Sequence, residues 1–131
     1  MYAAPCGVYC KVCPSYEKSC WGCRSEKPQK RISKKSCPLR LCTSRKKIKF
    51  CVECNVFPCK TYTSRLLSTH TKDARYQYRR DAAFDMKLIL TEGIRVWDKY
   101  QHEKWTCPHC NGQIIFYSYQ CENCHKLCFP D

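Results

Sequence analysis

Residues 107–124 read CPHCNGQIIFYSYQCENC, in which two Cys-x-x-Cys pairs stand ten residues apart. Each pair brings two sulfurs to one side of a tight turn, and both pairs meet when the intervening segment folds back as two strands. Four thiolates around one Zn²⁺ leave no open position for water, so the spacing predicts a structural zinc ribbon. The predicted ligands are Cys107, Cys110, Cys121 and Cys124.

The composition makes cysteine the main source of stability. Cysteine fills 15 of the 131 positions, whereas Leu, Ile, Val and Phe together fill only 23, and the formal net charge is +13. Such a chain buries too little apolar surface to fold on that basis alone. The N-terminus shows no basic and apolar leader, so we expect a cytoplasmic protein whose reduced thiols bind metal. No apolar run reaches the ~18 residues of a membrane span, and we expect no membrane association.

Cysteine usage divides the chain into three segments. We expect a cysteine-rich metal-binding module over 1–59, a helical connector over 60–106 and the zinc ribbon over 107–131. The predicted fold class is small α+β and metal-stabilised, with a zinc-finger-like N-terminal module.

The connector carries the only clear helical pattern. Apolar residues recur at spacings of three and four from Met86 to Tyr100, which is the period of an amphipathic helix. Gly93 interrupts this pattern and is expected to end one helix before the next begins. An earlier helix is expected to start after Pro58 and Cys59. Core packing is the expected role of Trp97, Tyr100 and Trp105.

The ten cysteines of the N-terminal segment suffice for two further sites and two spare thiols. The first predicted site consists of Cys10, Cys13, Cys20 and Cys23. The second consists of Cys51, Cys54 and Cys59 with either Cys37 or Cys42, and Cys6 or Cys37 could exchange between the sites. We favour zinc, for about three zinc sites in the chain, but four thiolates serve an iron–sulfur cluster equally well in this segment. Cys128 is a further spare thiol.

Four motifs in the N-terminal segment resemble a known family. They are Cys6-Gly-Val-Tyr-Cys10, Cys20-Trp-Gly-Cys23-Arg24, Lys49-Phe-Cys51-Val-Glu-Cys54 and Val56-Phe-Pro-Cys59. The chain is similar through them to short cysteine-rich prokaryotic proteins catalogued as domain of unknown function 3795. Relatives often continue through a helical stretch with Gly-Ile and Lys-Trp pairs into a zinc ribbon. The resemblance therefore implies metal binding and this architecture, and it implies no reaction.

The chain departs from those relatives at three turns. Lys11, Asn111 and His125 stand where relatives usually have glycine directly after a cysteine pair. These departures remove no ligand.

Positive charge is concentrated between Arg24 and Lys49, where eleven Lys and Arg residues face the single Glu26. Loops fixed by metal ligation and charged in this way favour contact with a phosphate backbone. The predicted nucleic-acid-binding residues are Lys30, Arg31, Lys34, Lys35, Arg45, Lys46, Lys47, Lys49, Arg75, Arg79 and Arg80.

The sequence favours a non-enzymatic module, since it has no phosphate-binding glycine loop, nucleophile motif or histidine ligand pattern. We expect contact with RNA or a ribonucleoprotein, and contact with a protein partner through the ribbon. Two alternatives remain: an iron–sulfur or thiol-based redox or sulfur-handling protein, and a zinc-ribbon adaptor for protein interactions. The sequence predicts neither the oligomeric state nor the identity of a partner.

Overall fold

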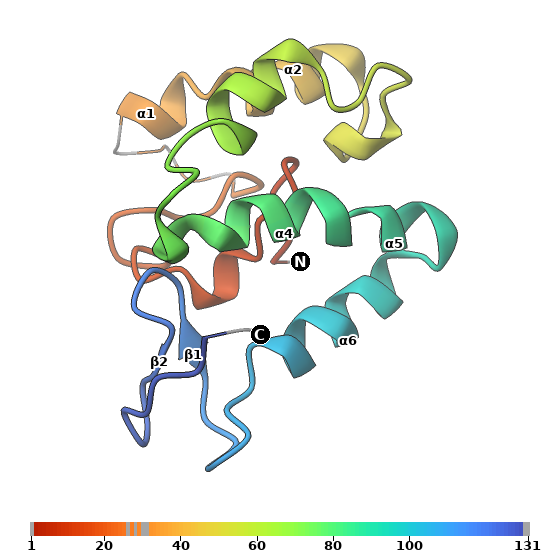
Figure 1. The fold of residues 1–131 in the computed structure, drawn as a ribbon. Coiled ribbons are helices and arrows are strands. Elements are labelled where there is room, and N and C mark those ends of the chain that lie inside the picture. The colour runs from red at the N-terminus through yellow and green to blue at the C-terminus, as the bar shows by residue number, and fades with distance from the viewer. Residues whose placement is uncertain (1, 26, 28, 30–31, 130–131) are drawn as a thin grey trace.

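The computed structural model describes residues 2–25, 27, 29 and 32–129, and shows a small helix-rich protein with one two-stranded sheet (Figure 1). The helices are α1 (Ile32–Lys35), α2 (Pro38–Lys46), α3 (Lys60–Tyr62), α4 (Gln77–Asp85), α5 (Lys87–Thr91) and α6 (Ile94–Lys104). One-turn 3₁₀ helices span Cys10–Val12, Cys51–Glu53 and Ala74–Tyr76, and a π-helical turn spans Thr63–Leu67. Strands β1 (Ile114–Ile115) and β2 (Gln120–Cys121) pair antiparallel.

The arrangement places the basic helices and the ribbon at opposite ends. α4 crosses the middle of the molecule, with α1 and α2 on one side of it and the β1–β2 ribbon on the other (Figure 1). None of the helices in the described part of the chain has the length and apolar character that a membrane crossing requires.

Local sequence explains where α2 begins and ends. Pro38 occupies its first turn, where the missing N–H costs no hydrogen bond. Lys47 ends the helix in the left-handed conformation, with φ of 58°, and its N–H donates to the Ser44 carbonyl at 3.2 Å. Arg45 and Lys46 lie in the last turn, where the helix dipole favours cations.

The break between α5 and α6 confirms the expectation for Gly93. Its φ of 93° is a conformation that other residues rarely adopt, and its N–H donates to the Leu88 and Ile89 carbonyls of α5. Trp97 and Trp105 are buried as expected, but Tyr100 is 41% exposed, so its predicted core role is wrong. α6 turns Trp97 and Gln101 inward, and Tyr100 lies beside that face.

One hydrophobic core draws on all three predicted segments. Its buried members include Tyr9, Val12, Leu39, Tyr62, Met86, Trp97, Ile114, Phe116 and Tyr119. Backbone hydrogen bonds reinforce it, since the Phe116 N–H donates to the Val12 carbonyl at 3.0 Å and the Cys51 N–H to the Pro5 carbonyl at 2.8 Å. The ribbon, the helices and the N-terminal loops therefore pack as one body.

Candidate metal centres and basic surface

The four cysteines predicted for the ribbon lie together. One sulfur from each of Cys107, Cys110, Cys121 and Cys124 lies within 4.8 Å of the other three. The Sγ atoms of Cys107 and Cys124 are 3.7 Å apart, and those of Cys110 and Cys121 are 3.5 Å apart. Tetrahedral Zn²⁺ with bonds of about 2.3 Å separates its sulfurs by about 3.8 Å. This group, called the ribbon site below, therefore has the spacing of a single tetrahedral metal ion.

Backbone N–H groups of the two turns point at the ribbon sulfurs. Three such groups donate at 3.4 Å: His109 to Cys107, Gly112 to Cys110, and Asn123 to Cys121. Hydrogen bonds of this kind favour the thiolate form that binds metal. The turns that bring the sulfurs together therefore also stabilise their deprotonated, negatively charged form.

Three residues of these turns explain how the turn conformation is kept although glycine does not directly follow either cysteine pair. Asn111 and His125 adopt φ of 64° and 62°, so both turns keep the left-handed residue despite the sequence departure. Gly112 has a different reason to be glycine. A Cβ at this position would lie 2.7 Å from the Cys121 sulfur, which is closer than real Cβ contacts allow.

The pKa values of two ribbon thiols are shifted in opposite directions. A hydrogen bond with the Asn123 side chain is the main cause that lowers the pKa of Cys110. At Cys124 the Lys126 N–H acts to lower the pKa, but burial and the neighbouring sulfurs outweigh it and raise the pKa. A divalent cation removes this mutual repulsion, so the donor set fits a thiolate-bound metal. The Sγ atom of Cys128, 3.9 Å from that of Cys107, is a fifth sulfur beside the group.

Six cysteines of the N-terminal segment line one cavity of about 310 Å³, called the thiol cavity below. They are Cys6, Cys10, Cys13, Cys20, Cys23 and Cys37. The structure thus brings together all four residues predicted for the first N-terminal site. All ten N-terminal cysteines belong to the described residues, yet no three of their sulfurs lie within 4.8 Å of one another.

The other four N-terminal cysteines line a cavity of about 30 Å³, called the small cysteine pocket. They are Cys42, Cys51, Cys54 and Cys59, so of the two residues left open by the sequence it is Cys42 that joins this group. Lys46 of α2 donates from Nζ to the Cys54 sulfur at 3.2 Å. Cys59 caps α3, and its sulfur accepts from the Tyr62 N–H at 3.5 Å.

The basic residues around α1 and α2 are exposed. Lys35, Arg45, Lys46, Lys47 and Lys49 all reach solvent, although Lys46 also contacts Cys54. Lys30 and Arg31, and the side chain of Lys34, lie outside the described part of the chain. No described carboxylate lies within ion-pair distance of Arg45, Lys47 or Lys49, which we call the basic surface. Among the described residues, no carboxylate neutralises the charge of this surface.

The three arginines predicted before and within α4 make internal contacts instead. Arg75 pairs with Asp73 at 2.7 Å. Arg79 donates to the Thr69 hydroxyl at 3.1 Å and lies over the Tyr76 ring, 4.8 Å from its centroid. Arg80 donates to the Gln77 side chain at 3.2 Å. These contacts hold the corner that leads into α4, so the structure gives the three arginines a role in the fold.

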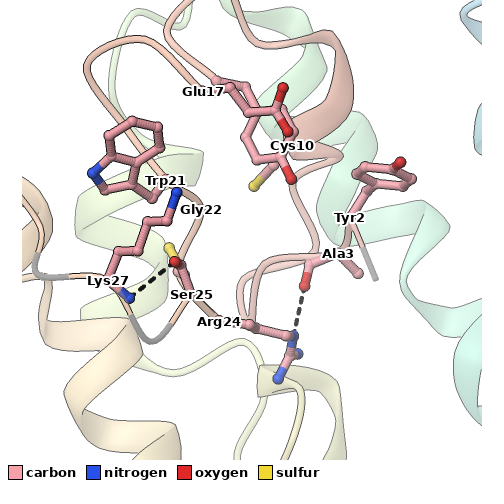
Figure 2. A pocket seen from close by; sticks show the side chains of 11 residues that line it. Tyr2, Ala3, Cys10, Glu17, Trp21, Gly22, Arg24, Ser25 and Lys27 are labelled. Carbon is pink, nitrogen blue, oxygen red and sulfur yellow. Dashed lines mark hydrogen bonds between the residues drawn. The ribbon is translucent and has the colours of Figure 1, made fainter.

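Sequence reasoning missed an open pocket of about 560 Å³ near the N-terminus (Figure 2). Trp21 and Lys27 form one wall, with the Lys27 ammonium 4.5 Å from the ring centroid. Arg24 donates from Nε to the Ala3 carbonyl at 2.7 Å and fixes the N-terminal segment. Cys10 and Cys23 line both this pocket and the thiol cavity, so the two spaces adjoin. The sequence feature that could have indicated this pocket is the Trp21-Gly22 pair between Cys20 and Cys23.

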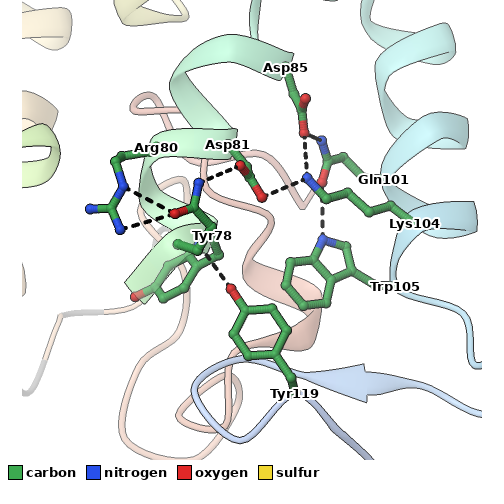
Figure 3. Close-up of polar contacts among 9 residues, drawn as sticks. Tyr78, Arg80, Asp81, Asp85, Gln101, Lys104, Trp105 and Tyr119 are labelled. Carbon is green, nitrogen blue, oxygen red and sulfur yellow. Dashed lines mark hydrogen bonds and ion pairs between the residues drawn. The ribbon is translucent and has the colours of Figure 1, made fainter. Parts of the chain in front are cut away.

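A polar network between α4 and α6 was also missed (Figure 3). The Lys104 ammonium lies 3.0 Å from the Asp85 carboxylate and 3.2 Å from that of Asp81. Gln101 donates to Asp85 at 3.0 Å and accepts from the Trp105 indole at 3.2 Å. The network satisfies buried polar groups and fixes α6 on α4, so its role is structural.

Comparison with known proteins identifies only the N-terminal region. Residues 14–64 match the family described as "Protein of unknown function (DUF3795)", so this part of the chain is similar to the family that the motifs resemble. The match includes seven of the ten N-terminal cysteines and ends before the ribbon. No curated protein and no solved structure matches the chain.

Proposed function

We propose that the protein is a zinc-stabilised, non-enzymatic module that binds RNA, free or in a ribonucleoprotein, through its basic surface. The spacing of the four ribbon sulfurs carries the metal part of this proposal. Their separations of 3.5 and 3.7 Å suit one tetrahedral ion. Four protein ligands leave such an ion no open position, so its role is structural rather than catalytic.

The ribbon metal supports packing beyond its own turns. Tyr119 and Phe116 lie between the two cysteine pairs and are 1% and 3% exposed. Holding the turns together keeps these rings in the shared core. Zinc binding therefore contributes directly to the folding free energy of the whole protein.

The small cysteine pocket is proposed as a second single-ion site. Four thiols line a space of about 30 Å³, roughly the volume of one water molecule. The Lys46 ammonium at Cys54 offsets part of the negative charge of a four-thiolate site. No three of its sulfurs lie within 4.8 Å of one another, so binding an ion requires these side chains to move inward, and a space of this size holds one ion at most.

The basic surface supports the RNA part of the proposal. α2, which contains Arg45 and ends at Lys47, lies on the opposite side of α4 from the ribbon (Figure 1). Unpaired Lys and Arg side chains on short, fixed elements bind phosphates and release counterions, so such binding weakens as salt rises. The expected recognition is of the backbone, with little dependence on base sequence.

Fluorescence anisotropy with a labelled single-stranded RNA tests this proposal at several salt concentrations. Joint substitution of Arg45, Lys47 and Lys49 by Ala removes three charges and is expected to lower the slope of log K against log[salt] by about 2. The matched control replaces Lys72, Arg95 and Lys99, three exposed residues outside α1, α2 and the basic surface. Equal losses in the two triple variants, or no RNA binding at low salt, would refute the basic surface as the site.

A further inference from the structure

The thiol cavity differs from the ribbon site in size. Its volume of about 310 Å³ equals roughly ten water molecules. It is lined by six cysteines, among them the two Cys-x-x-Cys pairs Cys10/Cys13 and Cys20/Cys23. A single ion with four sulfurs in contact fills only a small part of such a space.

The distances between the cysteine sulfurs also favour a group larger than a single ion. One tetrahedral Zn²⁺ needs sulfurs about 3.8 Å apart, and two zinc ions that share thiolates need them equally crowded. In the thiol cavity no three cysteine sulfurs lie within 4.8 Å of one another, whereas all four do in the ribbon site. The small cysteine pocket shares this spread but encloses only about 30 Å³, so the spread favours a cluster only together with the larger volume of the thiol cavity. A cubane cluster places its iron and sulfide core between the cysteine sulfurs and so holds them farther apart.

The other walls of the cavity suit an anionic cluster. Arg65 and Arg79 line it, and a [4Fe–4S] cluster with four thiolates carries a net charge of about −2 in its oxidised form. Leu39, Leu66 and Phe116 add apolar surface to the lining. Low exposure to water and nearby positive charge are the means by which a protein retains and tunes such a cluster.

We infer that the thiol cavity binds a [4Fe–4S] cluster through Cys10, Cys13, Cys20 and Cys23. These residues form two Cys-x-x-Cys turns, each of which offers two sulfurs from one short segment. Cys6 and Cys37 each enter the lining singly and remain outside the ligand set. Cys10 and Cys23 also line the neighbouring open pocket, so this side of the cluster site adjoins a second space.

Analysis of the full-length protein purified without oxygen tests this inference. We expect about four iron and four acid-labile sulfide per chain, in addition to zinc. The protein should be brown, and dithionite should bleach its visible absorption. A colourless protein that contains zinc but neither iron nor sulfide would overturn the inference, and this result needs no variant to fold.

Substitutions then test the ligand set. Cys13→Ser and Cys20→Ser should each lose most of the iron and sulfide, while Cys6→Ser, Cys37→Ser and Cys128→Ser should retain them. Cys110→Ser should lose zinc from the ribbon site and keep its iron. Iron content that is unchanged in Cys13→Ser and Cys20→Ser, or abolished in Cys6→Ser, would contradict the assignment. RNA binding is tested separately, with the basic-surface variants. A failure of the RNA proposal would therefore not change the iron and sulfide contents that test the cluster.

Discussion

The phenol oxygen of Tyr119, in the ribbon, accepts a hydrogen bond from the backbone N–H of Tyr78 at 3.0 Å (Figure 3). Tyr78 lies in the first turn of α4, where backbone N–H groups have no partner within the helix. The Tyr78 ring also stacks on Phe116, with the ring centroids 4.1 Å apart. The ribbon therefore supplies a hydrogen-bond acceptor at the N-terminal end of α4. Loss of order in the ribbon should consequently destabilise the helices as well.

Tyr119→Phe tests this link with the loss of a single oxygen. Tyr119 is 1% exposed, so the substitution leaves a buried N–H at Tyr78 without its acceptor. The expected cost is about 1–3 kcal/mol in the free energy of unfolding. Denaturant unfolding of the zinc-loaded protein measures it.

Tyr100→Phe is the matched control, because Tyr100 is 41% exposed and its substitution should change stability by less than about 0.5 kcal/mol. If both variants were equally stable, the Tyr119 hydroxyl would contribute nothing to joining the ribbon and α4.

Lys104→Met should destabilise the protein in a pH-dependent way. Burial alone lowers the pKa of Lys104, but attraction by Asp85 and Asp81 outweighs burial and raises it. A raised pKa in the folded state means that the ammonium stabilises the fold below its unfolded pKa of about 10.4. This contribution disappears as the pH rises through the folded pKa.

Denaturant titrations of the wild type and of Lys104→Met should therefore differ by about 1–3 kcal/mol at pH 8 and converge above about pH 10.5. Lys99→Met removes an exposed lysine of the same helix and serves as the control. A difference that stays constant up to pH 11 would show that Lys104 acts through packing rather than through its charge.

Gly112→Ala should weaken zinc binding at the ribbon site. The added Cβ would lie 2.7 Å from the Cys121 sulfur and 3.2 Å from the Cys110 sulfur, so the ligands must move apart. The expected loss is about 10–100-fold in zinc affinity, measured by competition with a chromogenic chelator. Asn111→Gly changes the neighbouring position, which already has φ of 64°, and should keep its affinity. Equal affinities for Gly112→Ala and the wild type would mean that the site tolerates the displacement.

The sequence predicted the ribbon cysteines well because the ligand spacing is local. Two Cys-x-x-Cys turns need only a short return of the chain, and Gly93 likewise marks its helix break within a few residues. The choice of Cys42 over Cys37 was not predictable from spacing. It depends on α2, which places Cys42 in the small cysteine pocket and leaves Cys37 at the thiol cavity.

Contacts across the chain were the least predictable. Tyr78 and Tyr119 lie 41 positions apart, and Lys104 reaches Asp81 across 23. Neither pair belongs to a recognisable motif. Tyr100 shows the limit of periodicity, because a spacing of three from Trp97 left it beside the buried face rather than on it.

Zinc content is the most direct measure of the ribbon site, compared between the full-length wild type and Cys121→Ser under the same metal loading. Cys121 is fully buried and its sulfur belongs to the four-sulfur group. We expect Cys121→Ser to contain about one zinc ion per chain fewer than the wild type. We expect Cys128→Ser to retain the zinc content of the wild type. Equal zinc content in Cys121→Ser and the wild type would contradict the assignment of a metal ion to the ribbon.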